Sequence, residues 1–365
     1  MPPAAGSGAH ETRLDFAAQL RTLARVTACA PAGDIPARLD ARIVDGHCKI
    51  LASLVAQWTQ HWLARARPFF DQVVPTADLP GRVVYPFGGG DLLTALVVFP
   101  KASEITTLSL EPAGDPRALE QIDPADLSVA LAEVRKKVNH LFSIGHSKTV
   151  DMDHLAKGNK LPGDLTYAVV ALTVNDFDIV SVRFFRVESS GALEYLTAEG
   201  LSAAESVSGR RSPFASVEIE YQPHAGGPRR TFRHIAVNLD DTHLGADPSV
   251  LRHLEAKGQV AAMTKAASYL LWWKEFGAIR NYLLHNMVWM VSDSTGIPTD
   301  QARAAGFEQI PFGRFDGPFL GGGNRPTEVF KALWTDGAEP LTFRFGYPDS
   351  AGHDHLLITR RATQK

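Results

Sequence analysis

The stretch RVVYPFGGGDLLTALVVFP, Arg82 to Pro100, decides the fold class. Its first part, Val83 to Phe87, is apolar and rich in β-forming residues, as in a buried strand. Asp91 then stands where a helix N-cap belongs, directly before the apolar run Leu92 to Phe99. The tract ITTLSLEP, Ile105 to Pro112, predicts a second strand. Strand, helix and strand in this order form a βαβ unit, which requires parallel strands and a right-handed crossover.

Composition places the chain among ordinary globular proteins. It has 365 residues, of which 45% are hydrophobic and 21% charged, so it can bury a sizeable core. The net charge of −3 gives no bias toward nucleic acid. No long apolar run is present, so no transmembrane segment is expected. Residues 1–12 lack a signal-peptide pattern and are expected to form a disordered tail. A cytoplasmic location is favoured, with export as the alternative if a leader was removed.

Helical periodicity dominates the N-terminal part of the chain. From Ile43 to Trp62, apolar and aromatic side chains recur at spacings of three and four, which predicts a long helix with one packing face. Cys29 and Cys48 lie in this region and form no metal-binding pair. Two buried free thiols are the favoured interpretation, and one disulfide is the alternative in an oxidising compartment. We expect a helical segment over residues 13–80, packed on one α/β domain over residues 81–365.

Further elements follow in the α/β domain. Helices are expected near residues 119–142, 165–174, 261–286 and 327–334. Strands are expected at DIVSVRFFRV, ASVEIEYQ, RRTFRHIAVNLDD, MVWMVSD, LTFRFGY and HLLITRR, with a long surface loop over residues 306–326. The fold class is therefore α/β, with a Rossmann-like (methyltransferase-like), mostly parallel sheet, an N-terminal helical addition and late antiparallel strands.

The glycine turn Gly88 to Gly90 is the first candidate site. Backbone N–H groups at a helix N-terminus attract ligands, and Glu111, twenty-one residues after Gly90, ends the next strand, where an acid can hold a ribose. The turn is neither GxGxxG nor a P-loop. The Asp91 carboxylate argues against a pyrophosphate and fits a ligand with a positive centre. In the alternative interpretation, the glycines only let the helix pack closely and Asp91 is an ordinary cap.

The segment resembles the first motif of class I S-adenosylmethionine-dependent methyltransferases, in which a Gly-rich turn faces the methionine part and an acid after the second strand holds the ribose. The resemblance implies cofactor contacts at Tyr85 and at the turn, a cationic centre near Asp91 and a ribose at Glu111. Those enzymes usually have an acidic residue near the position of Tyr85. The whole chain also resembles a poorly characterised bacterial group through YPFGGGD, KAASYLL followed by F-x-x-I-R, and SDSTGIP. Some members of that group look exported.

Polar residues elsewhere offer further candidates. Asp293, in SDSTGIP, follows a predicted strand and is the candidate acid/base residue, with AVNLDD expected at the same edge of the sheet. Turn chemistry also explains these residues. The loop NHLFSIGHSKTVDMDHL is rich in His and Asp but matches no standard metal motif, so no metal ligand is assigned. Its GHSKT departs from the G-x-S-x-G nucleophile elbow at the fifth residue.

These features lead to one main hypothesis and two alternatives. The main hypothesis is a small-molecule-binding protein, with transferase chemistry on a nucleoside-containing cofactor such as S-adenosylmethionine. The first alternative is a non-catalytic exported or envelope protein with a degenerate Rossmann-like fold. The second is a metal-dependent hydrolase that uses the Asp/His-rich loop and Asp293.

Overall fold

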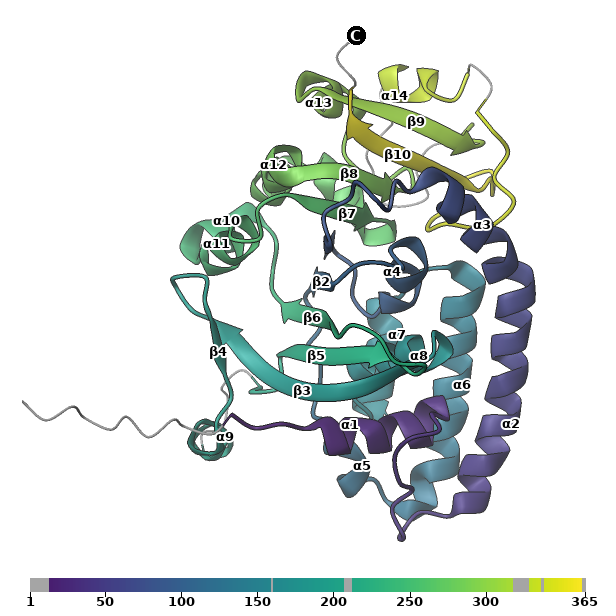
Figure 1. Cartoon of the computed structure of the whole chain (residues 1–365), viewed down its shortest axis with the longest axis vertical. Coiled ribbons are helices and arrows are strands. Elements are labelled where there is room, and N and C mark those ends of the chain that lie inside the picture. Colours follow the sequence, from purple (N-terminus) through teal and green to yellow (C-terminus); the bar gives the residue numbers. More distant parts are fainter. Residues whose placement is uncertain (1–12, 159, 207–211, 318–327, 336–337, 363–365) are drawn as a thin grey trace, which may run out of the picture.

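The computed structural model describes residues 13–158, 160–206, 212–317, 328–335 and 338–362, and the expected N-terminal tail lies outside them. The protein is α/β, with one ten-stranded mixed sheet in the order β4-β3-β5-β6-β2-β1-β7-β8-β10-β9 (Figure 1). The strands are β1 (Arg82–Pro86), β2 (Glu104–Ser109), β3 (Phe177–Val187), β4 (Leu193–Tyr195), β5 (Ser216–Pro223), β6 (Arg230–Ala236), β7 (Val260–Thr264), β8 (Met287–Ser292), β9 (Phe307–Gly313) and β10 (His355–Arg361).

Helices cover both faces of this sheet. The α-helices are α1 (Ala17–Leu23), α2 (Ala41–Trp58), α3 (Ala64–Val73), α4 (Leu92–Val98), α5 (Ala118–Gln121), α6 (Leu127–Ile144), α7 (Thr149–Asp153), α8 (Gly163–Val174), α9 (Ala198–Glu205), α10 (Asp241–Ala246), α11 (Ser249–Glu255), α12 (Gly277–Asn286), α13 (Thr299–Ala304) and α14 (Glu328–Ala332). Short 3-10 or π-helical turns are η1 (Ala24–Ala28), η2 (Thr59–Leu63), η3 (Pro124–Asp126), η4 (His154–Gly158), η5 (Ala266–Trp272) and η6 (Lys274–Phe276).

The centre of the sheet is parallel. β1 pairs with β2 and with β7, β2 pairs with β6, and β7 pairs with β8, all in parallel. The predicted βαβ unit of β1, α4 and β2 is therefore confirmed. The remaining five pairings between the described strands are antiparallel and lie at the two sides of the sheet. The expectation of a parallel sheet with late antiparallel strands holds at the centre and at β9 and β10. It fails at the other side of the sheet, where β3, β4 and β5 form an antiparallel extension before β6.

Two hydrophobic cores lie on opposite faces of the sheet. In β1, Val83 and Tyr85 belong to one core and Val84 to the other, as the alternation of side chains along a strand requires. The first core also contains Leu20 of α1 and Leu51 of α2, so the N-terminal helices and the sheet share one apolar interior. In Figure 1, α2 and α6 run along the outer side of this layer, and α10, α11 and α12 lie on the other side of the sheet.

The predicted long N-terminal helix is confirmed. Asp40 begins it, because its side chain accepts a hydrogen bond from the backbone N–H of Arg42 at 2.9 Å. α2 continues through η2 into α3, so the helical path runs from Ala41 to Val73. Trp58 stacks on Phe142 of α6 with ring centroids 5.3 Å apart. The aromatic stripe is therefore a packing face.

The expected single helix over residues 261–286 is wrong. The first part of this stretch forms β7, which lies between β1 and β8, and α12 begins only at Gly277. β7 is buried on both faces, so its sequence shows an apolar run without alternation. Such a run has no periodicity that separates a central strand from a buried helix. The position of this stretch between β1 and β8 in the sheet therefore determines that it is a strand and not a helix.

Two expectations near the C-terminus are also wrong. Part of the predicted 306–326 loop is β9, and residues 318–326 lie outside the described part. The many glycines of this stretch indicated a loop, but β9 is an edge strand, where a proline such as Pro311 is tolerated. The segment LTFRFGY is not a strand, and its Phe343 and Phe345 pack on Phe70 of α3 instead. The strand at HLLITRR is confirmed as β10.

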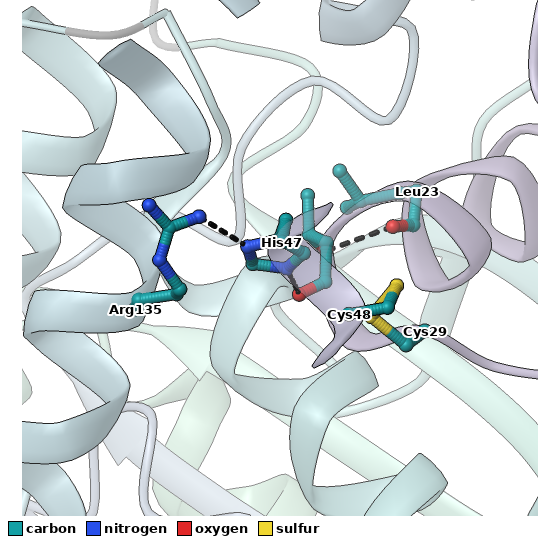
Figure 2. The surroundings of a disulfide bond; sticks show 6 residues. Leu23, Cys29, His47, Cys48 and Arg135 are labelled. Carbon is teal, nitrogen blue, oxygen red and sulfur yellow. Dashed lines mark hydrogen bonds between the residues drawn. A yellow bond between two sulfur atoms is a disulfide. The ribbon is translucent and has the colours of Figure 1, made fainter. Parts of the chain in front are cut away.

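Cys29 and Cys48 form a disulfide, so the expectation of two free thiols is wrong (Figure 2). Their Cα atoms are 5.6 Å apart, and 19 positions separate them in the sequence. Beside the bond, His47 donates from Nε2 to the carbonyl oxygen of Thr27 at 2.9 Å and accepts from Arg135 at Nδ1. Burial lowers the pKa of His47, in keeping with this neutral form. The disulfide and these contacts join η1, α2 and α6.

Candidate functional site

The glycine turn lies between β1 and α4 and is closely covered by side chains. A Cβ atom on Gly88 would lie 2.7 Å from Cγ of Tyr85, and one on Gly90 would lie 2.8 Å from Cδ2 of Tyr167. Both distances are far below ordinary contact, so glycine is required at these two positions by packing. Aromatic rings therefore pack directly against Gly88 and Gly90, and the turn is buried.

Gly89 lies on the side of the turn that faces Glu111. A Cβ atom there would be 3.1 Å from Oγ of Ser147 and 4.0 Å from Oε2 of Glu111. Glu111 is partly exposed, and the hydroxyl of Thr149 donates to its carboxylate. The structure thus brings Glu111 beside the glycine turn, as the sequence analysis expected for a ribose-binding acid.

Asp91 holds an internal cation. Its carboxylate lies 2.8 Å from Nζ of Lys265, which follows β7, and both side chains are buried. The carboxylate also accepts hydrogen bonds from the hydroxyl of Tyr85 at 3.0 Å and from that of Thr94 at 2.9 Å. Lys265 further donates to Thr94 and to the carbonyl oxygen of Gly145. The charge of Asp91 is thus neutralised within the protein, where a ligand with a positive centre was expected.

The electrostatics of this cluster follow from its burial. Removal from water disfavours charge, so burial lowers the pKa of Lys265, and the neighbouring carboxylates of Asp91 and Asp293 oppose that change. Burial likewise raises the pKa of Tyr85, and Asp91 adds to the effect. Tyr85 therefore stays a neutral hydrogen-bond donor to Asp91.

Asp293 joins three segments that are distant in the sequence. Its Oδ2 accepts from the backbone N–H groups of Ala266 and Tyr347, each at 2.9 Å. Its Oδ1 accepts from the backbone N–H of Thr295 at 2.8 Å and from the same residue's hydroxyl. The side chain of Asp293 is fully buried and accepts hydrogen bonds from four donors. These contacts are those of a residue that holds neighbouring segments in place. Its assignment as an acid/base group stays a prediction.

Most side chains of the remaining polar motifs are paired internally, although Nε2 of the buried His146 has no hydrogen-bond partner among the described residues. In the Asp/His-rich loop, Asp151 lies 2.8 Å from Nζ of Lys137 and 2.6 Å from Nδ1 of His140. In AVNLDD, Asp240 caps α10 and Asp241 accepts from the first N–H groups of α12. Within the described part of the chain, no group of three or more His, Cys, Asp or Glu side chains is suited to a metal ion.

The sequence analysis missed one buried acid, Asp164. It lies in the first turn of α8, is not exposed, and has no hydrogen-bond partner at either carboxylate oxygen among the described residues. Its Oδ2 is 3.8 Å from Nδ1 of the equally buried His234. Burial raises the pKa of Asp164 to about 6, His234 opposes this change and Glu111 adds to it. Only the tertiary structure places the two side chains together.

The sequence analysis also missed a pocket on the other side of the sheet from the glycine turn's helix α4. A pocket of about 790 Å³ opens between the antiparallel extension and the helices α9, α10 and α11. Its wall includes the end of β3, the start of β5 and the residues Ala236 to Asn238, where β6 ends. The pocket thus lies at the carboxyl edge of a parallel strand, where open α/β sheets bind ligands. None of the residues Gly88 to Asp91, Glu111 or Asp293 lines it.

No described helix combines the length and the apolar character that a membrane crossing needs. The comparisons with family models, with curated proteins and with solved structures found no match to this chain.

Proposed function

We propose that this protein is a non-catalytic, exported small-molecule-binding protein with a degenerate Rossmann-like sheet, and that its ligand occupies the pocket beside β6. The pocket carries the proposal. Its volume of about 790 Å³ falls within the range of roughly 300–1,000 Å³ that is typical of ligand sites. The pocket lies at the carboxyl edge of the sheet, the edge at which open α/β folds bind ligands, but at the end of β6 and not in the crevice between β1 and β7.

The strand order supports the Rossmann-like part of the proposal. Numbered along the chain, the five parallel strands β1, β2, β6, β7 and β8 lie in the order three, two, one, four, five. This is the order of the doubly wound dinucleotide-binding sheet over those strands. β9 and β10 then follow as the late antiparallel pair.

The buried, side-chain-filled glycine turn between β1 and α4 supports the degenerate, non-catalytic part of the proposal. In such folds the ligand enters between the first and fourth strands, which here are β1 and β7. The Lys265–Asp91 ion pair joins the ends of these two strands. The ammonium group of Lys265 therefore occupies the place that a ligand's cationic centre would need.

The disulfide supports export. Disulfides persist mainly in oxidising compartments, and reducing systems keep cytosolic thiols free. Cys29 and Cys48 are bonded. This feature favours export over the cytoplasmic location that the sequence analysis preferred.

A fragment screen with two matched variants tests the proposal. Ala204 on α9 lines the pocket, and its neighbour Ala203 is exposed and does not. Charged and neutral fragments would be screened by saturation-transfer NMR against the wild type, Ala204→Trp and Ala203→Trp. We expect hits that Ala204→Trp removes and Ala203→Trp retains. Hits that both variants bind equally would place the ligand elsewhere and overturn the proposal.

A nucleoside-dependent transferase is the second candidate, favoured by the position of Glu111 beside Gly89. Calorimetry with S-adenosylmethionine and S-adenosylhomocysteine separates the two candidates. Binding that Glu111→Ala weakens at least tenfold, and that Glu120→Ala on the exposed surface of α5 leaves unchanged, would favour the transferase. We expect no binding heat with either compound, because side chains fill the glycine turn between β1 and α4.

A further inference from the structure

The charged side chains of the pocket identify the class of ligand it accepts. Besides the phenol of Tyr195, four of its lining residues are ionisable, namely Arg186, Glu194, His243 and Asp247, and none of these four is buried. They lie at the rim, where water also solvates them. The rim therefore offers no desolvated charge to a ligand that enters the pocket.

Most of these rim charges already have partners in the protein. Arg186 forms an ion pair with Glu194. His243 lies 2.7 Å from the Asp240 carboxylate through its Nδ1 atom. Asp247 accepts a hydrogen bond from the backbone N–H of Ser249 at 3.1 Å. A charged ligand would lose hydration on entry and find no buried opposite charge to replace it.

The buried side chains that line the pocket are apolar except for those of Ser216 and Ser249. The buried lining side chains include Phe185 from β3, Ile235 from β6, Leu244 from α10 and Val250 from α11, all members of one hydrophobic core. The buried hydroxyl of Ser216 accepts a hydrogen bond from the backbone N–H of Ala236 at 3.1 Å. Burial of apolar surface is therefore the main source of binding free energy available to a ligand here.

We infer that the pocket selects a neutral, largely apolar small molecule over an anionic one of the same shape. The inference rests on the proposed function, because it names the ligand class of the same pocket. A neutral ligand with an apolar ring or branched chain would bury its apolar surface against Phe185, Ile235 and Leu244. It would leave the ion pairs among the charged side chains at the rim intact. An anion must give up its hydration or break the Arg186–Glu194 pair.

Two fluorescent probes with one ring skeleton test the inference. N-phenyl-1-naphthylamine is neutral, and 8-anilinonaphthalene-1-sulfonate adds a sulfonate to the same rings. We expect the neutral probe to bind the whole chain at least tenfold more tightly. Ala204→Trp should weaken that binding at least tenfold, and Ala203→Trp should leave it within twofold of the wild type.

The outcomes separate this inference from the proposed function. Equal or tighter binding of the sulfonate, lost in Ala204→Trp, would overturn the neutral class and leave the pocket as the ligand site. Failure of both probes to bind would also overturn the neutral class, and the fragment screen would still decide the site. Probe binding that Ala204→Trp does not change would count against both.

Discussion

Lys265 stabilises the end of the sheet as an internal counter-ion. It is buried beside Asp91 at 2.8 Å, so Lys265→Met leaves a buried carboxylate without its cation. Loss of one partner of a buried pair typically costs about 3–5 kcal/mol. We expect a decrease of this size in the free energy of unfolding, measured by urea denaturation.

The double variant Asp91→Asn/Lys265→Met should recover part of the loss. Lys274→Met, at an exposed position, is the control. A loss no larger than that of the control would refute the role of the pair.

Asp164 predicts a pH dependence of stability. Burial raises its pKa to about 6 from the ordinary 3.8, so the folded chain binds this proton more tightly than the unfolded chain. Ionisation therefore lowers the stability of the folded state as the pH rises through this interval. Asp164→Asn removes the cost. Relative to the wild type, the variant should gain about 2 kcal/mol between pH 4 and pH 7, because one pKa unit corresponds to about 1.36 kcal/mol and the carboxyl of the unfolded chain is already partly ionised at pH 4.

Denaturation curves at several pH values measure this difference. Asp300→Asn, on the exposed surface of α13, controls for the loss of one negative charge. A stability difference between Asp164→Asn and the wild type that stays constant from pH 4 to pH 7 would show that Asp164 does not ionise in this interval.

At the scale of elements, the turn between β1 and α4 tolerates no added atom. Gly90→Ala would place a Cβ 2.8 Å from the ring of Tyr167, a member of the first core. Overpacking of a core typically costs about 1–3 kcal/mol. Thermal unfolding should show this loss. Gly245→Ala in α10, where a Cβ meets no atom within 4 Å, is the matched control and should not be destabilised by packing. Equal melting temperatures of the two variants would mean that the turn is open.

The disulfide connects η1 to α2, and its removal should destabilise the chain. Closing a loop over the 19 positions between Cys29 and Cys48 restricts the unfolded chain, which is worth about 3 kcal/mol. Cys29→Ser/Cys48→Ser should lose this amount in urea denaturation. Dithiothreitol should lower the wild type to the level of the variant and leave the variant unchanged. A wild type that is insensitive to the reductant, with free thiols found by mass spectrometry, would contradict the bond.

At the scale of the whole molecule, the N-terminal helices and the sheet should unfold together. They share one hydrophobic core, in which Leu51 of α2 packs in the same cluster as Leu92 of α4. Tryptophan fluorescence and far-UV circular dichroism should therefore report one transition with the same midpoint. Separate midpoints would mean that residues 13–80 form an independent unit.

The parts of the fold that follow local rules were predictable from the sequence. Asp91 marks a helix start because its side chain caps the N–H groups of the next turn, and this holds in any context. Short apolar runs rich in β-forming residues likewise identified β1 and β2, and helical periodicity identified the long helix α2. The stretch at β7 gave no such signal, because it shows no alternation and its residues Ala261 to Met263 are good helix formers.

The sequence by itself determined the βαβ unit, the N-terminal helices and the residue types available to a site, because capping and periodicity act over a few positions. Only the tertiary structure decided that Lys265 reaches Asp91, that Cys29 bonds to Cys48 and that the open pocket lies beside β6. These outcomes depend on which strand ends become neighbours. Strand order is set by the burial of whole faces, which no short stretch of sequence encodes.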